Sequence, residues 1–184
     1  MTEDNNSMWM AVTDKYYSDN QPLRNLLLVH SRLVADKALK VAASHPELGI
    51  DVRFLEEAAM LHDIGIFLTD APPIHCFGSH PYICHGYLGA DLLRSEGLPR
   101  HALVAERHTG TGLTLRQIQE QGLPVPHRDM VPVSIEETVI CFADKFYSKT
   151  HPDREKSVAD AVLSLSKFGE DTVSRFRLWC ERFL

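Results

Sequence analysis

The sequence predicts an all-α fold. Amphipathic segments, in which apolar residues recur at three-to-four spacing, follow one another along the whole chain. Residues that favour helix starts and stops separate them, as Pro22 and Pro46 do for the longest segment. No two alternating segments suggest neighbouring strands, and no repeat or low-complexity tract interrupts the pattern.

The elements follow in order along the chain. The expected helices span residues 7–18, 22–45, 51–65, 80–97, 99–108, 134–150, 155–169 and 170–183. Asp51 is the expected N-cap of the third helix, Gly65 its stop, and Ser134 with Glu137 forms a capping-box pattern. Turn formers mark two loops, 67–79 and 109–134, and the second loop contains a short helical patch near Thr114.

Composition narrows the class of protein. A chain of 184 residues fits one domain, so we expect a single domain over 1–184. The net charge of -6 argues against a nucleic-acid polymer as partner, but local cations or a metal could still capture a small phosphorylated substrate. No apolar run reaches the ~18 residues of a membrane span, and the polar N-terminus is unlike a secretion signal. Four cysteines without a C-x-x-C pair indicate reduced thiols, and we expect a cytoplasmic location without membrane contact.

Four of the ten histidines and two aspartates lie on faces expected to be buried. They are His30, His62, Asp63, His85, His108 and Asp144. Singly, each is better explained as a hydrogen-bonded core residue. Together they would leave a largely unsatisfied polar core, which bound cations would remove. Imidazole and carboxylate suit iron, manganese or zinc, and helical bundles commonly hold metals in this way.

The other histidines lie in loops or precede prolines, where a surface or structural role is the simpler interpretation. A rival zinc site would use Cys76, His80 and Cys84, but these spacings fit structural zinc poorly. His80 could instead contact a substrate.

The ordered set H…HD…H…H…D carries a specific resemblance. With "HDIG" at 62–65, "HTGTG" at 108–112 and "ADK" at 143–145, the chain resembles the HD-domain metal-dependent phosphohydrolase superfamily, in its HDIG form. It is also similar to a set of small, largely uncharacterised prokaryotic HD proteins. The resemblance covers about residues 25–150 and implies an HD-domain helical bundle with a metal site in its core. The C-terminal helices over 155–184 would pack on that bundle or form a homodimer contact.

The resemblance also implies a ligand set and a reaction. His30, His62, Asp63 and Asp144 would hold one divalent metal, and Asp63 would bridge to a second, bound also by His85 and His108. Iron or manganese is expected first, with zinc, nickel and cobalt also suited to these ligands. A metal-activated hydroxide would then attack a phosphomonoester or phosphodiester of a nucleotide or other small phosphorylated metabolite.

Asp63 and Lys145 are therefore the expected catalytic residues. Lys145 follows Asp144 directly and would donate to a substrate phosphate, although a solvated helix face also explains it. Backbone N–H groups at Thr109, Gly110 and Gly112 could meet an anion, or form a plain turn.

Two other functions remain open. A di-iron HD-type oxygenase acting on a polyol or phosphonate would use the same six ligands. A non-catalytic signalling domain is the third alternative, but degenerate relatives of that kind have typically lost ligands, and all six are present here.

Overall fold

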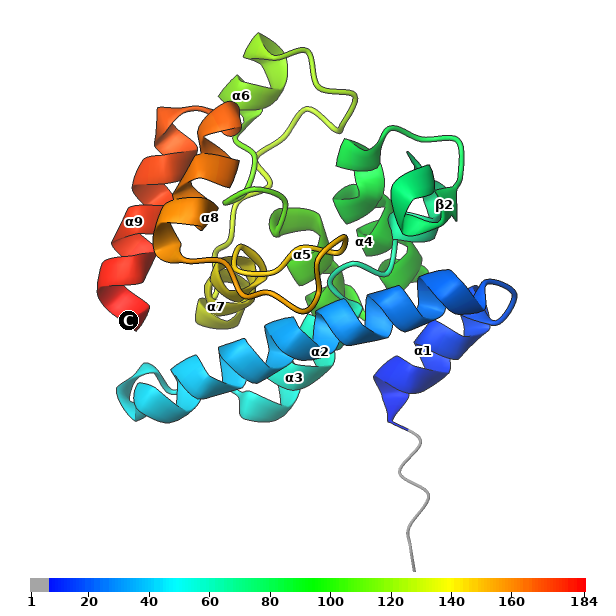
Figure 1. Ribbon diagram of the computed structural model, residues 1–184, viewed down its shortest axis with the longest axis horizontal. Coiled ribbons are helices and arrows are strands. Elements are labelled where there is room, and N and C mark those ends of the chain that lie inside the picture. Colours follow the sequence, from blue (N-terminus) through cyan, green and yellow to red (C-terminus); the bar gives the residue numbers. More distant parts are fainter. Residues whose placement is uncertain (1–6) are drawn as a thin grey trace, which may run out of the picture.

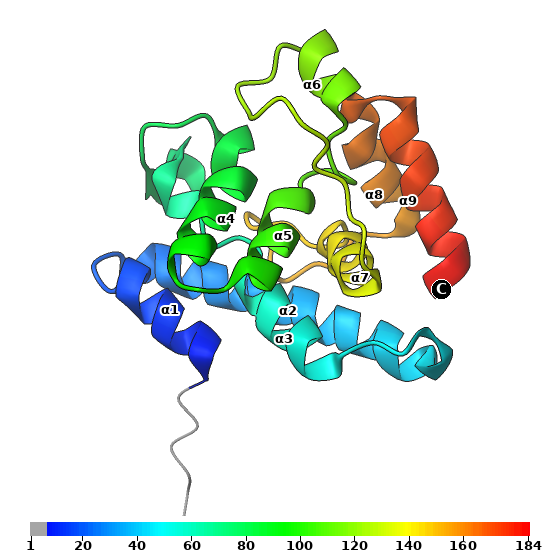
Figure 2. The ribbon, with the colours of Figure 1, turned by 180° about the vertical axis from the view of Figure 1, so that it is seen from behind.

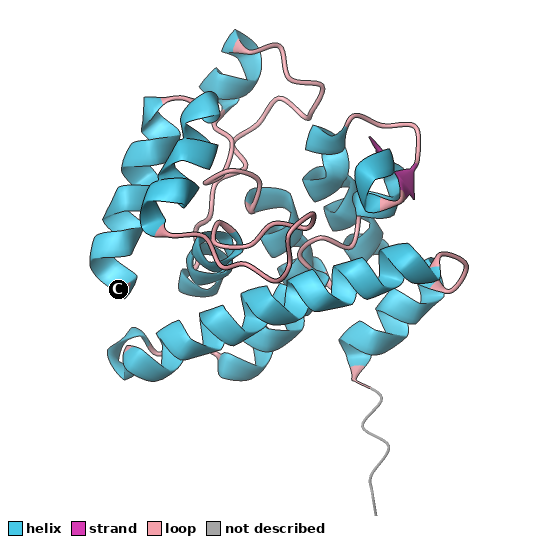
Figure 3. Ribbon diagram, viewed as in Figure 1, coloured by secondary structure: helices cyan, strands magenta, loops and turns pink. Residues whose placement is uncertain are grey.

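The computed structural model describes residues 7–184 and is all-α, as the sequence predicts (Figures 1 and 3). Its helices are α1 (Met8–Tyr17), α2 (Gln21–Ser44), α3 (Val52–Leu61), α4 (His85–Ser95), α5 (Pro99–Arg107), α6 (Leu115–Glu120), α7 (Ile135–Asp144), α8 (Val158–Leu165) and α9 (Glu170–Phe183). Short 3-10 turns connect several of them. Within residues 7–184, no helix combines the length and apolar character that crossing a membrane requires.

The long helix α2 forms one side of the molecule, with α3 alongside it and α1 near its N-terminal end (Figures 1 and 2). Helices α4 and α5 pack together, as do α8 and α9. The expected caps are present: the Asp51 carboxylate accepts from Phe54 N, and the Ser134 hydroxyl accepts from Glu137 N. The Glu137 carboxylate does not complete a capping box, because it accepts from Val133 N and Arg107 instead.

One apolar core joins α2, α3 and α7 to the two C-terminal helices. An aromatic cluster links them: the Phe142 ring lies 5.7 Å from Phe176 and 5.2 Å from Phe183, centroid to centroid. A second core fills the space between α1, the first half of α2, α4 and α5. The α8–α9 pair therefore covers the face of α7 that α2 and α3 leave open.

The structure differs from the sequence prediction where helices end. Helix α3 ends at Leu61 with His62 as its C-cap, not at 65, and α7 ends at Asp144, not near 150. Residues 82–84 form a 3-10 turn, so that α4 begins at His85. The predicted loop 67–79 contains a short hairpin, β1 (Asp70–Ala71) paired with β2 (Cys76–Phe77), which is too short to leave a pattern of alternation.

Gly65 has a different role from the predicted helix stop. Its φ is -86°, an ordinary right-handed value, so the left-handed conformation of a C-terminal glycine is not needed. Instead it lies against the start of α4. A Cβ atom at residue 65 would overlap the His85 carbonyl oxygen and lie 2.5 Å from Gly89 N. Only glycine allows this close approach of the two backbones.

We expect Gly65→Ala to lower the free energy of unfolding by about 2 kcal/mol, because the added methyl group must push α4 away. His85 would move with α4, so metal binding should weaken as well. Denaturant midpoints and metal titration measure the two effects.

Gly122→Ala is the control, because no atom lies within 4 Å of the added Cβ. Its left-handed backbone should cost about 1 kcal/mol and leave metal binding unchanged. Equal metal affinity in both variants would contradict this role for Gly65.

Candidate metal centre

Six buried side chains converge from five segments of the chain. Four of them stand at helix ends: His62 caps α3, His85 begins α4, His108 caps α5, and Asp144 ends α7. His30 lies within α2, and Asp63 follows the end of α3. Relative exposure is 9% or less for all six. The positions where the helices stop therefore decide where the polar cluster forms.

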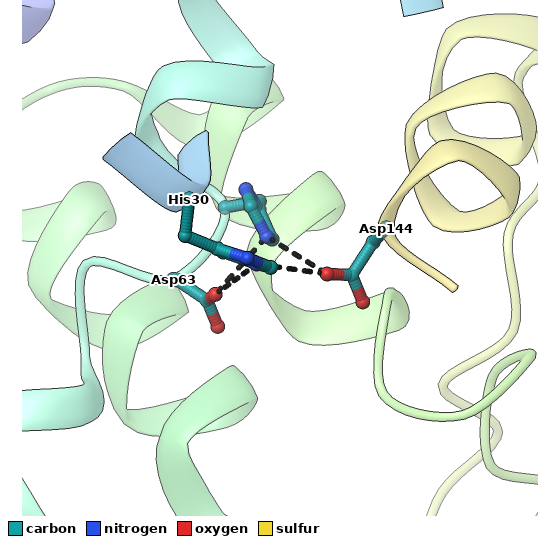
Figure 4. A group of neighbouring side chains, drawn as sticks. His30, Asp63 and Asp144 are labelled. Atoms are coloured by element: carbon teal, nitrogen blue, oxygen red, sulfur yellow. Dashed lines mark hydrogen bonds and ion pairs between the residues drawn. The ribbon is translucent and has the colours of Figure 1, made fainter. Parts of the chain in front are cut away.

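The first group combines His30, His62, Asp63 and Asp144 (Figure 4). His30 Nε2 lies 3.0 Å from Asp144 Oδ1 and 3.2 Å from Asp63 Oδ2. His62 Nε2 lies 3.1 Å from Asp63 Oδ2 and 3.5 Å from Asp144 Oδ1. Two imidazole nitrogens and two carboxylate oxygens thus face one small volume.

The second group combines Asp63 with His85 and His108. The other carboxylate oxygen of Asp63, Oδ1, lies 3.4 Å from His85 Nε2 and 3.3 Å from His108 Nε2. Each oxygen of Asp63 therefore faces a different pair of histidines. This is the arrangement in which one carboxylate can bridge two cations.

Backbone carbonyls fix the orientation of three of the rings. The Nδ1 atoms of His62, His85 and His108 lie 2.6 to 2.8 Å from the carbonyl oxygens of the residues three positions earlier. Each Nδ1–H therefore donates to a carbonyl oxygen of the preceding helical turn. The Nε2 atoms are then directed into the cluster, as metal-ligating histidines require.

Unsatisfied polar atoms show that a cation fits. His85 Nε2 and His108 Nε2 lie only 3.0 Å apart, although both neutral rings present lone pairs there. His62 Nε2 and both oxygens of Asp63 are buried without a properly aligned hydrogen-bond partner. Two acceptors facing each other in a buried site repel unless a positive charge lies between them. The donor set suits divalent transition metals.

The helix directions favour cations as well. The C-terminal ends of α3, α5 and α7 all lie at the cluster, since His62, His108 and Asp144 stand there. The C-terminus of a helix carries a partial negative charge. Three such ends add to the two carboxylates and make the centre more attractive to positive charge.

The pKa values follow from burial and from this crowding. Burial would raise the pKa of Asp63, but Lys149 and His62 hold it well below its usual range. Burial lowers the pKa of His62, yet attraction to Asp63 and Asp144 outweighs this and raises it to about 9. Burial lowers the pKa of His85 to about 3, and the repulsion that would arise if His108 were also protonated adds to this. The two groups thus differ in charge: a protonated His62 beside a neutral His85.

Two lysines neutralise the carboxylates. Lys145 Nζ lies 2.6 Å from Asp144 Oδ2 and donates to the His108 carbonyl oxygen at 3.0 Å. Lys149 Nζ lies 2.5 Å from Asp63 Oδ2. The sequence prediction included Lys145 but missed Lys149. Because α7 ends at Asp144, Lys149 reaches the centre from a turn, and its spacing from the other residues gives no signal of this.

A cavity of about 420 Å³ opens beside the centre. His85, His108 and Asp144 line it, together with Thr109, Gly110 and Lys145 from the predicted substrate contacts. Tyr82, which the sequence prediction did not single out, also lines it and stacks on His85 with ring centroids 4.7 Å apart.

Gly112 and His80 do not line this cavity, and their predicted substrate contacts stay untested. Gly112 packs against Val131 and Pro132, and His80 is exposed. Within residues 7–184, Cys76, His80 and Cys84 do not gather into a metal-ligand group, and the Cys84 thiol donates to the Pro124 carbonyl oxygen.

The all-α fold and this buried His/Asp cluster define a helical domain able to hold divalent metal ions. The family model of the HD domain matches residues 27–148, two thirds of the sequence, and the chain belongs to that family. The predicted resemblance to the HD superfamily and the predicted fold class are thereby confirmed. Members of this family are typically metal-dependent hydrolases.

Three curated relatives are similar to this chain. An uncharacterized protein of Methanocaldococcus jannaschii is 33% identical over 79% of this chain and 80% of its own length. Proteins named tRNA (cytidine(56)-2'-O)-methyltransferase, from Picrophilus torridus and Thermoplasma volcanium, are 32% and 28% identical over 82% and 81% of this chain. The match spans only 42% and 39% of those two proteins. No solved structure matches the chain.

Substitutions should separate the two metal positions. Because Asp63 belongs to both groups, we expect Asp63→Ala to abolish binding at both. Asp144→Ala should impair only the first group and His85→Ala only the second. Elemental analysis of the three purified variants beside the wild type measures this. Wild-type metal content in Asp63→Ala would contradict the bridging role.

Metal binding should release a proton from His62. With a pKa raised to about 9, this ring is charged in the metal-free protein at neutral pH, whereas a ligand must be neutral. Metal affinity should therefore rise with pH up to about 9. The charged His62 ring also stabilises the metal-free fold. This contribution to the free energy of unfolding is complete below the pKa of the ring in the unfolded chain, and it is lost as the pH rises through about 9.

Calorimetric titration with Mn²⁺ in buffers of different ionisation enthalpy measures the proton count. His62→Gln should lose this proton release, and the exposed-site control His127→Gln should retain it. Equal release from wild type and His62→Gln would assign the proton to another group.

Proposed function

We propose that this protein is a metal-dependent phosphohydrolase acting on a nucleotide or another small phosphorylated metabolite. One observation carries the proposal: two His/Asp groups share Asp63 and adjoin a cavity whose wall bears lysine ammonium groups. Divalent cations bound there would lower the pKa of a water and offset the charge that develops on phosphoryl oxygens. Phosphoryl transfer depends mainly on such positioning and electrostatic stabilisation.

The chain's own residues would bind and orient the phosphate. Lys145 is held between Asp144 and the His108 carbonyl, so its ammonium group has a fixed place at the cavity wall. Lys149 is likewise held by Asp63. Each can donate to a phosphoryl oxygen as a point charge. We assign Asp63 and Lys145 as catalytic residues, and Thr109 with Gly110 as neighbouring contacts.

A smaller cavity of about 280 Å³ adjoins the first and shares Tyr82, Ser148 and Lys149 with it. Its remaining wall is mostly apolar: Ala71, Pro73 and Ile74 line it. A flat or apolar group such as a nucleobase fits this position, while its phosphate lies beside the metals. This favours an organic phosphate over inorganic phosphate alone.

The named relatives do not supply the substrate. Methyl transfer to tRNA is the activity in the names of two proteins that this chain matches over less than half their length. The proposal therefore depends on the cavity and on the family. A di-iron oxygenase would use the same ligands. A neutral polyol would leave Lys156 and Lys167 of the wall without a counter-charge, whereas a phosphonate would supply one as a phosphate does.

Anaerobic purification, elemental analysis and a panel of phosphoesters test the proposal. We expect two transition metals per chain, with iron and manganese the first to be tried, and phosphate release from at least one nucleotide or sugar phosphate. Asp63→Ala should lower the rate by about a thousandfold or more, because activation at both metals is lost.

Lys40→Gln is the control, because Lys40 is exposed on α2 and should leave the rate unchanged. Unchanged hydrolysis in Asp63→Ala would remove this centre from the reaction. Oxygen consumption by the iron-loaded protein, with no ester cleaved, would favour the oxygenase. Absence of both activities with metal bound would favour a signalling domain.

A further inference from the structure

Lysines are concentrated at one place in this acidic protein. The seven lysines of the chain are Lys15, Lys37, Lys40, Lys145, Lys149, Lys156 and Lys167. Four of them, Lys145, Lys149, Lys156 and Lys167, line the cavity beside the metal centre. Among the described residues that line this cavity, Asp144 is the one acidic residue. Its wall is therefore strongly positive although the whole chain carries a net charge of -6.

The four lysines fall into two pairs. Lys145 and Lys149 are balanced by Asp144 and Asp63. Lys156 and Lys167 form no ion pair with a described carboxylate. Burial lowers the pKa of Lys156. Attraction to Asp144 raises it in part, and repulsion from Lys145, Lys167 and Lys149 lowers it. Lys156 is half-buried and Lys167 is exposed, and both line the cavity, so an anion bound there would supply the counter-charge that no ion pair gives them.

This unbalanced pair comes from a separate part of the chain. Lys156 lies in the segment between α7 and α8, where its backbone N–H donates to the Phe146 carbonyl oxygen at 2.8 Å. Lys167 lies in the 3-10 turn that follows α8. Both are beyond residue 148, where the match to the HD domain ends. The C-terminal segment thus adds charge to a cavity whose metal ligands all come from the family region.

We infer that Lys156 and Lys167 form a second phosphate subsite, so that the substrate carries at least two phosphoryl groups. This inference rests on the proposed phosphohydrolase function and names its substrate class. One phosphoryl group would be cleaved at the metal centre beside Lys145 and Lys149. The other would lie against Lys156 and Lys167.

Charge supports this assignment. A phosphoryl group carries about -1.5 to -2 at neutral pH. A single one at the metals would leave the two outer lysines without a counter-charge, whereas a second one matches them. The cavity volume of about 420 Å³ accommodates a diphosphate together with part of an organic group. Nucleoside diphosphates and triphosphates and bisphosphorylated metabolites share this chemistry.

Binding of two non-hydrolysable probes tests the inference without using activity. Orthophosphate and methylenediphosphonate are titrated calorimetrically into the intact protein, with and without bound manganese. We expect the diphosphonate to bind at least about tenfold more tightly than orthophosphate, because it gains charge-assisted contacts at the second subsite.

Lys156→Gln and Lys167→Gln should each weaken diphosphonate binding by about threefold to tenfold and leave orthophosphate binding nearly unchanged. The double variant should bind the two probes about equally. Lys40→Gln is the charge-matched control and should behave as wild type. Thermal melting of each variant shows that the fold is retained, which is expected since both side chains lie at the cavity wall and not in the core.

Equal binding of both probes by the wild type would overturn the second subsite, as would variants that keep the preference. Stronger binding of a short single-stranded oligonucleotide than of the diphosphonate would overturn the small-substrate class. A diphosphonate preference without hydrolysis of any ester would reject the proposed function and retain the subsite. Hydrolysis of monophosphates, with no higher affinity or rate when a second phosphate is present, would retain the proposed function and reject the second subsite.

Comparison of substrates then separates the sources of the second phosphate. A nucleoside diphosphate and a sugar bisphosphate, each beside its monophosphate, are assayed with wild type and Lys156→Gln. For the substrate class that the protein uses, Lys156→Gln should lower kcat/KM for the diphosphorylated compound by about tenfold. The same substitution should leave kcat/KM for the matching monophosphate almost unchanged. Equal losses for mono- and diphosphate substrates would contradict a second subsite.

Discussion

Charge compensation in a buried space is the constraint on which this structure depends. Asp63 and Asp144 lie within the fold with almost no exposed surface, where an unpaired carboxylate would cost several kcal/mol. Four imidazoles and two ammonium groups surround them, and three helix ends direct their negative poles at the same place. Such a surplus of acceptor atoms is stable when divalent cations occupy it. The helices are then the frame that holds this electrostatic arrangement.

Much of this could be predicted from the sequence, for a physical reason. Amphipathic periodicity indicates which residues face a core. The helices and the six inward-facing polar residues could therefore both be predicted. The helix ends were harder to predict: α3 ends at Leu61 and α7 at Asp144, both before the residues expected from the sequence, and helix boundaries are the least certain part of a pattern of periodicity. Lys149 could not be predicted at the site, because it reaches Asp63 from the turn that follows α7. Gly65 was noted in the sequence as a helix stop. Its actual role, the close contact with α4, depends on tertiary packing that the sequence alone does not indicate.

The family region and the C-terminal segment contribute differently to the site. All six candidate ligands lie within residues 27–148, the part that the HD domain model matches. The cavity beside them is completed by residues after that limit, including Ala161, Leu165 and Phe168. The same segment packs into the core through α9, so its position is coupled to the fold. The candidate metal ligands thus come from the family region alone, whereas the cavity wall beside them comes from both parts of the chain.

The placement of ligands at helix ends has a further consequence for motion. Helices normally open from their ends, where few hydrogen bonds hold the last turn. In this protein the last turns of α3, α5 and α7 and the first of α4 meet at one point. A cation bound there would hold these four helix ends together. Local opening of any one of the four helix ends would then require release of the metal. Amide exchange in these turns would then report metal occupancy, and metal loss would loosen the centre of the molecule before its periphery.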